Sequence, residues 1–139
     1  MANVSLTQDL PVPAQMVWAT IGNFNAMHDW HPAVEKTEQE EEEGATIRRL
    51  HLVGGGQIVE KLERVDDNER LYSYSILGGA LPVANYTASI RVTDTGGGCS
   101  VEWSSEFDAA GVPENDATAA IRGIYETGFE NLKRMFGAR

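Results

Sequence analysis

The stretch from Glu114 to Phe136 constrains the fold most, because it is the one long helix that the sequence predicts. Pro113 and the polar residues after it mark the start of this helix, and Gly137 marks its end. At 1.5 Å per residue the helix is about 35 Å long. Apolar and small residues recur along it at helical spacing: Ala117, Ala120, Ile121, Ile124, Tyr125, Gly128, Phe129, Leu132, Met135 and Phe136. We expect this face to pack on the strands that precede it.

Gly128 interrupts this apolar face. Glycine in a helix interior lowers helix stability by about 1 kcal/mol relative to alanine. Two structural explanations for its presence are available. Either a strand approaches the helix closely at this position, or the missing side chain leaves room for a ligand.

The rest of the chain predicts an antiparallel sheet of about seven strands. Alternating apolar and polar residues are separated by turn-forming residues such as Gly54-Gly55-Gly56 and Gly96-Gly97-Gly98. The expected strands are residues 3–10, 33–37, 45–52, 57–66, 70–77, 85–93 and 99–107. Two short helical segments, 14–21 and 24–29, follow the first strand. The expected class is α+β, with all 139 residues in one domain.

Residues 38–43 form a dense acidic run that ends at Gly44. Neighbouring carboxylates repel one another and are typical of a solvated surface. We therefore expect the tip of a hairpin and not a metal site. The group of His28, Asp29 and His31 has no established ligand spacing, so we expect no metal there either.

Charge and cysteine content narrow the class of protein. A formal charge of −10 disfavours nucleic acid and anionic membranes as partners, because both attract basic surfaces. The single cysteine, Cys99, suits a reducing compartment. The sequence shows no signal peptide and no apolar run near the ~20 residues of a membrane span. We expect a soluble cytoplasmic protein without a cofactor, either a monomer or a homodimer.

The strand pattern also predicts which side chains point into the core. Successive side chains of a strand face opposite sides of a sheet, so the apolar positions identify the inner face. That face carries an unusual set of residues: Arg48, Glu60, Tyr72, Tyr74, Tyr86 and Trp103. His51 has the opposite parity and is expected to point outward. Two explanations stay open: Arg48 and Glu60 form a structural ion pair, or the sheet and the last helix enclose a cavity with a polar floor.

Several segments together resemble a known family: Trp30-His31-Pro32, Gly44 to Arg48, Glu60-Lys61-Leu62 with Asp66-Asp67, Leu81-Pro82-Val83 with Tyr86, and Val101-Glu102-Trp103. They resemble polyketide cyclase/dehydrase-type members of the SRPBCC superfamily, the START-like, birch-pollen-allergen-like group. The resemblance covers nearly the whole chain. It implies the helix-grip fold, in which a curved antiparallel sheet wraps a long C-terminal helix and leaves a cavity between them.

The leading functional hypothesis is the binding of a small hydrophobic or aromatic molecule, lipid-like or polyketide-like, in that cavity. The expected ligand-binding residues are Trp30, His31, Arg48, Glu60, Tyr72, Tyr74, Tyr86, Trp103, Tyr125 and Gly128. Arg48 is the expected anchor for a carboxylate or keto oxygen, because a guanidinium is a fixed fork of donors.

Two alternatives remain. The first is a cyclase or dehydratase without a metal or covalent nucleophile, in which Glu60 is the base and Arg48 a hydrogen-bond donor. His28, His31 and His51 are further acid/base candidates, although each has the simpler interpretation of a loop or surface histidine. The second is a protein-interaction or stress-associated module with a filled core and no small ligand.

Overall fold

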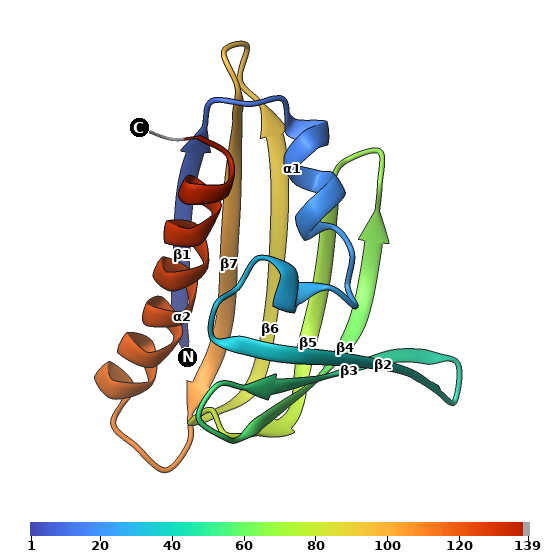
Figure 1. The fold of residues 1–139 in the computed structure, drawn as a ribbon. Helices are drawn as coiled ribbons and strands as arrows, with labels where there is room; N and C mark the ends of the chain where they lie inside the picture. The colour runs from blue at the N-terminus through green and yellow to red at the C-terminus, as the bar shows by residue number, and fades with distance from the viewer. Residues whose placement is uncertain (138–139) are drawn as a thin grey trace.

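The computed structural model describes residues 1–137 and contains one seven-stranded antiparallel sheet with helices on one of its faces (Figure 1). In chain order the elements are β1 (Ala2–Leu10), α1 (Ala14–Ile21), the 3-10 helix η1 (Met27–Asp29), β2 (Val34–Glu42), β3 (Ala45–Leu52), β4 (Gln57–Asp66), β5 (Leu71–Gly79), β6 (Val83–Asp94), β7 (Cys99–Ala109) and α2 (Glu114–Met135). The strands lie in the order β1-β7-β6-β5-β4-β3-β2. The predicted α+β class and element order are confirmed.

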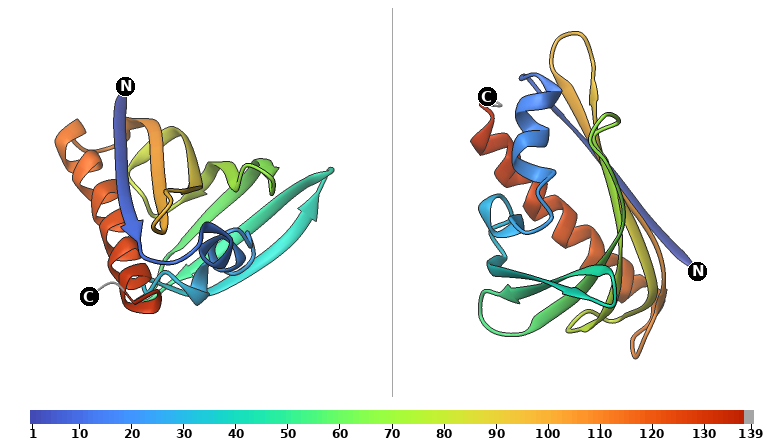
Figure 2. Two further views of the ribbon diagram at one scale, coloured as in Figure 1. Left: turned by 90° about the horizontal axis from the view of Figure 1, so that it is seen from above. Right: turned by 90° about the vertical axis from the view of Figure 1, so that its right-hand side faces the viewer.

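The sheet curves around its helices. Figure 2 shows α1, η1 and α2 on the concave side, with α2 against the β1–β7 end and α1 beside β6. β-Bulges interrupt the pairing of β2, β4 and β6, and such extra residues bend a strand and increase its twist. As a result, β2 and β3 run across the direction of the other strands in Figure 1. This curvature gives the sheet a hollow inner face.

The acidic run departs from the prediction, because most of it is strand and not hairpin tip. β2 continues to Glu42, and only Glu43 and Gly44 form the turn, both with positive φ (52° and 81°). The acidic side chains stay exposed on this strand. They are tolerated because β3 supplies partners for them: the Arg49 guanidinium lies 3.6 Å from Glu40, and the His51 ring contacts Glu38 at 2.5 Å.

The predicted inward faces of the strands are confirmed by burial. The alternating positions of β7 that include Val101, Trp103 and Phe107 are buried, and so are Tyr72 and Tyr74 on β5. The buried positions of α2 are Ala117, Ile121, Tyr125, Gly128, Phe129 and Leu132. Met135 was expected on this face but is 43% exposed, whereas its neighbour Phe136 packs against the core.

Gly128 marks a close approach of aromatic rings to α2, and not of a strand. A Cβ atom at this position would lie 2.9 Å from His31 Cδ2, 3.0 Å from Trp30 Cζ3 and 3.1 Å from Trp103 Cζ3. These distances are shorter than ordinary van der Waals contacts between carbon atoms. The absent side chain therefore makes room for three rings of the protein itself.

The same approach allows His31 to bind the helix backbone. Its Nε2 lies 2.7 Å from the Ile124 carbonyl oxygen, and its Nδ1 accepts a hydrogen bond of 3.2 Å from the Ala33 amide. This pairing fixes the neutral tautomer with the proton on Nε2. Burial lowers the pKa of His31 below its ordinary value, against the opposing effect of the Ile124 hydrogen bond. His31 thus ties the segment before β2 to α2.

We predict opposite effects for two glycine-to-alanine changes in α2. Gly128→Ala should lower the free energy of unfolding by up to about 2 kcal/mol, because overpacking outweighs the gain in helix propensity. Gly123→Ala is the matched control, since no atom lies within 4 Å of the added Cβ, and it should raise stability by about 0.5–1 kcal/mol. Urea unfolding of both variants measures this. Equal stabilisation by both would show that the three rings do not need the space at Gly128.

We also predict that His31 stays neutral at pH values at which a free histidine is charged. Because the pKa of His31 is lowered, neutral His31 contributes its full stabilisation of the folded state above the ordinary histidine pKa of 6.5. It is lost as the pH falls below that value, since only the unfolded chain then takes up the proton. The loss is at most about 1.4 kcal/mol per pH unit. An NMR titration of the His31 ring checks this, and protonation at or above pH 6.5 would contradict it.

Candidate functional site

A cavity of about 230 Å³ lies between the concave face of the sheet and α2. Its walls are mostly apolar side chains of β2, β3, β4, β5, η1 and the adjoining loops: Met27, Ala33, Val34, Leu50, Leu52, Val53, Ile58, Ile76 and Leu81. Glu60 and three tyrosines, Tyr74, Tyr86 and Tyr125, bring polar groups into it, with His31, Gly55, Trp103 and Ile124 completing the lining. Apolar walls with a few convergent polar groups are typical of small-molecule sites.

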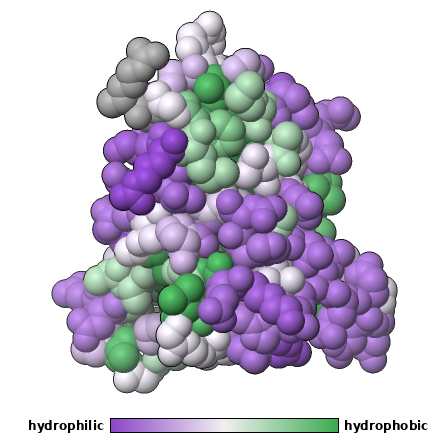
Figure 3. All heavy atoms as spheres, in the orientation of Figure 1, coloured by the Kyte–Doolittle hydropathy of each residue, from purple (hydrophilic) through white to green (hydrophobic). Residues whose placement is uncertain are grey.

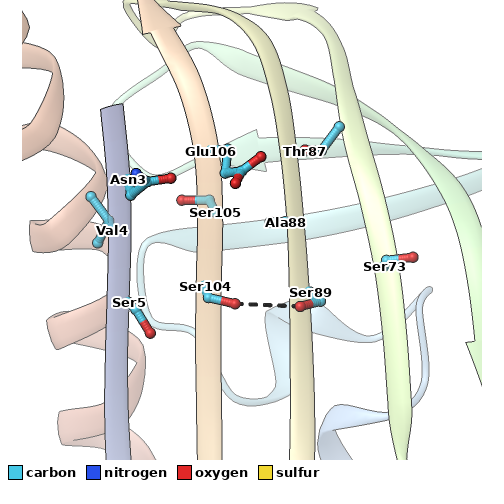
Figure 4. Close-up of a pocket in the computed structure, with 10 residues that line it drawn as sticks. All are labelled: Asn3, Val4, Ser5, Ser73, Thr87, Ala88, Ser89, Ser104, Ser105 and Glu106. Atoms are coloured by element: carbon cyan, nitrogen blue, oxygen red, sulfur yellow. Dashed lines mark hydrogen bonds between the residues drawn. The ribbon is translucent and has the colours of Figure 1, made fainter. Parts of the chain in front are cut away.

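A second depression, of about 420 Å³, lies on the outer face of the sheet. Figure 4 shows its short side chains on β1, β7, β6 and β5, among them Ser89 and Ser104, whose hydroxyls lie 3.4 Å apart. Glu106 is its one ionisable residue. No helix covers this face in Figure 2. The inner cavity has the enclosing walls and the more varied chemistry, so it is the candidate site.

Arg48 and Glu60 form a buried ion pair behind the cavity. The two residues are direct partners across β3 and β4. Arg48 is 0% exposed, and its Nε and Nη2 each lie 2.7 Å from Glu60 Oε1. Its Nη1 donates to the Phe24 carbonyl oxygen at 3.0 Å, and its guanidinium lies 4.0 Å from the Phe24 ring centre. Arg48 does not line the cavity, whereas Glu60 does.

The pair keeps a carboxylate at the cavity wall. Burial raises the pKa of Glu60, and the contact with Arg48 opposes that rise. Arginine does not lose its proton in proteins. A neutral Glu60 would leave the Arg48 charge buried without a partner, which costs about 3–5 kcal/mol. We therefore assign the ionised state to both residues, with Oε1 held by Arg48.

The three tyrosine hydroxyls form a chain that begins at Trp103. Trp103 Nε1 donates to the Tyr74 hydroxyl at 3.0 Å, and the Tyr74 and Tyr86 hydroxyls lie 3.4 Å apart. The Tyr86 hydroxyl is in turn hydrogen-bonded to that of Tyr125. The Trp103 ring stacks on Tyr125 with ring centres 4.1 Å apart. Strands β5, β6 and β7 and helix α2 therefore converge on one hydrogen-bonded group.

These phenols are donors at neutral pH. Burial raises the pKa of Tyr86 to about 12, although its hydrogen bonds to Tyr125 and Tyr74 oppose the rise. Burial likewise raises the pKa of Tyr74 and of Tyr125 well above the ordinary value. A protonated phenol donates one hydrogen bond, and its oxygen can accept others.

Six of the expected ligand-binding residues line the cavity: His31, Glu60, Tyr74, Tyr86, Trp103 and Tyr125. Four lie elsewhere. Arg48 is behind Glu60, Tyr72 packs on Phe24 and Trp18, and Trp30 and Gly128 lie in the contact between α2 and the sheet. His28 bonds Thr37 and His51 contacts Glu38, so neither lies at the cavity.

Most of the apolar residues that line the cavity were not among the expected ligand-binding residues. Leu50, Ile58 and Ile76 were on the predicted inner faces and could have been included by strand parity. The loop residues Ala33, Val53 and Leu81 could not, because periodicity does not determine where a loop side chain points.

Within residues 1–137, no group of three or more His, Cys, Asp or Glu residues is placed to hold a metal ion. In the same part of the chain, no helix combines the length and the apolar character needed to cross a bilayer.

Two solved structures share this fold over nearly their whole length. The protein XoxI from Bacillus cereus is 33% identical, with a TM-score of 0.90 and coverage of 98% of this chain and 96% of its own. A protein from Bacillus thuringiensis is also 33% identical, with a TM-score of 0.89 and coverage of 97% and 98%.

A more distant similarity connects the chain with abscisic acid receptors. The abscisic acid receptor PYL2 of Arabidopsis thaliana is 27% identical over 94 residues, which are 64% of this chain and 50% of the receptor. The chain spans about half the length of the curated relatives it matches. The resemblance to the SRPBCC superfamily is confirmed by these relatives together with a family match over residues 1–137. By that match, the protein belongs to the family described as "Polyketide cyclase / dehydrase and lipid transport".

Proposed function

We propose that this protein binds a small hydrophobic or aromatic molecule in the cavity between the sheet and α2. The observation that carries the proposal is the cavity itself, with apolar walls and a carboxylate and phenols among its lining residues. The related protein PYL2 is named as a receptor for abscisic acid, which supports a binding role. The alternative of a module without a ligand predicts a filled core, and the open volume of about 230 Å³ counts against it.

The volume limits the size of the ligand. An engineered apolar cavity of about 150 Å³ in another protein holds benzene. A cavity of about 230 Å³ therefore suits a compound of one or two rings. A sterol or a two-chain lipid exceeds it unless the walls move apart.

We predict that filling the cavity abolishes binding. Ile76→Trp places a large ring in the cavity, whereas Leu77→Trp, one position along β5 at a residue that is 58% exposed, serves as the matched control. The probes are naphthalene and 2-naphthol, added at ten times their dissociation constants. The wild type and the control should gain about 1.4 kcal/mol of stability, a rise of a few degrees in Tm. The Ile76 variant should gain none. An equal gain by all three proteins would place the binding outside the cavity.

A second candidate function is proton transfer at carbon, of the kind that a cyclase or dehydratase needs. Glu60 favours it, because a buried carboxylate with a raised pKa is a stronger base than one in water. In this reaction Glu60 takes a proton from the carbon beside a ligand carbonyl. A tyrosine hydroxyl donates to the carbonyl oxygen as negative charge develops there.

We predict for this candidate that the protein accelerates hydrogen–deuterium exchange at the carbon beside the carbonyl of α-tetralone, a two-ring ketone. Glu60→Gln should reduce the acceleration about 10²- to 10⁴-fold. Glu63→Gln, an exposed carboxylate on the same strand, is the control and should keep the full rate. NMR spectra in D₂O follow the exchange. Binding of α-tetralone without acceleration by the wild type would leave a binding protein and rule out this chemistry.

A further inference from the structure

The polar groups that line the cavity also indicate the chemistry of the ligand, provided that the cavity binds one as proposed above. We propose that the ligand is a neutral hydroxyl compound, an alcohol, phenol or enol, whose hydroxyl group lies between Glu60 and the tyrosine chain. The proposal rests on the hydrogen bonds that the polar lining residues have already made and on those that they have left over.

Glu60 supplies an acceptor without a partner of its own. Arg48 contacts Oε1 with two nitrogens, and no hydrogen bond to Oε2 is found within residues 1–137. A carboxylate can accept several hydrogen bonds but donates none. A group that enters the cavity and meets Glu60 is therefore bound best if it carries an O–H or N–H donor.

The tyrosine chain supplies a donor without an acceptor. Three hydroxyls in a row carry three protons, and the two links between them use only two. If Tyr74 donates to Tyr86 and Tyr86 donates to Tyr125, the proton of Tyr125 is left over. If the direction of donation is reversed, the proton of Tyr74 is left over. Both residues line the cavity. The buried hydroxyl of Ser105 lies beside Tyr86 and Tyr125, but no hydrogen bond of ordinary geometry to either of them is found within the described chain.

The free acceptor on Glu60 and the free tyrosine donor together determine which functional groups of a ligand can be fully hydrogen-bonded in the cavity. A hydroxyl donates to Glu60 and accepts from the tyrosine, so it satisfies both. An ammonium group only donates and leaves the phenol proton unpaired. An ether or ketone only accepts and leaves Glu60 unpaired. An unpaired buried polar group costs about 1–3 kcal/mol.

A carboxylate ligand is expected to bind more weakly than a ligand with any of these groups. It would bring a second negative charge next to Glu60 in a buried site. The cavity lining contains no lysine or arginine to compensate, since Arg48 lies behind Glu60 and is already paired with it. His31 does not compensate either, because both of its ring nitrogens are engaged by backbone groups. Arg48 was the expected anchor for a carboxylate, and its position instead favours uncharged ligands.

The experiment compares four ligands on one two-ring frame: 2-naphthol, 2-methoxynaphthalene, 2-naphthoate and naphthalene. Calorimetric titrations at pH 7 use the wild-type chain, so the comparison does not require that any variant fold correctly. We predict that 2-naphthol binds at least tenfold more tightly than naphthalene. The other two should bind no more tightly than naphthalene, because methylation removes the donor and the carboxylate adds a charge.

Glu60→Gln adds a test at the residue itself. Its amide can donate to a carboxylate, so the preference for 2-naphthol over 2-naphthoate should fall at least tenfold, with the fold checked by NMR. Wild-type binding of 2-naphthoate as tight as that of 2-naphthol would overturn the hydroxyl proposal and leave the binding function standing. Failure of all four ligands to bind the wild type would overturn the binding function as well.

Discussion

The arrangement of the site depends on the pairing of Arg48 with Glu60. An arginine that is 0% exposed keeps its charge, so a carboxylate must stay beside it. The direct pairing of β3 with β4 places Glu60 across from it, and a bulge at Leu77 of β5 lies opposite the step from Val59 to Glu60. Arg48 holds one carboxylate oxygen from behind, and Glu60 also lines the cavity. An ion pair of this kind contributes little to stability by itself, but here it fixes a buried negative charge at a ligand-sized cavity.

The cavity also requires that α2 be held at a fixed distance from the sheet. Gly128 lets the rings of Trp30, His31 and Trp103 reach the helix, and His31 bonds to its backbone at Ile124. The interface between α2 and the sheet therefore contains both a tightly packed region and an open cavity. Figure 3 shows apolar surface beside the lower part of α2. Rigid packing around Gly128 favours a preformed cavity, since a ligand then meets walls that are already in place.

Periodicity predicted the order of the strands and helices and several of the polar and aromatic residues that line the cavity. Strand parity places Glu60, Tyr74, Tyr86 and Trp103 on one face, because alternation is a property of the backbone. It placed Arg48 on the same face but could not tell that Glu60 would lie between it and the cavity. It left two explanations for Gly128, and neither was the approach of three rings. Depth within a core depends on how side chains pack, which sequence spacing does not encode.

The central claim is that a small hydroxyl compound lies inside the cavity with its oxygen at Glu60. The most direct measurement is a set of intermolecular NOEs between 2-naphthol and the protein labelled at its methyl groups. Contacts with the methyl groups of Leu50, Ile58 and Ile76, all of which line the cavity, are the result that this account predicts. Contacts confined to the outer face, at the methyl group of Thr87 beside the second depression, would contradict it.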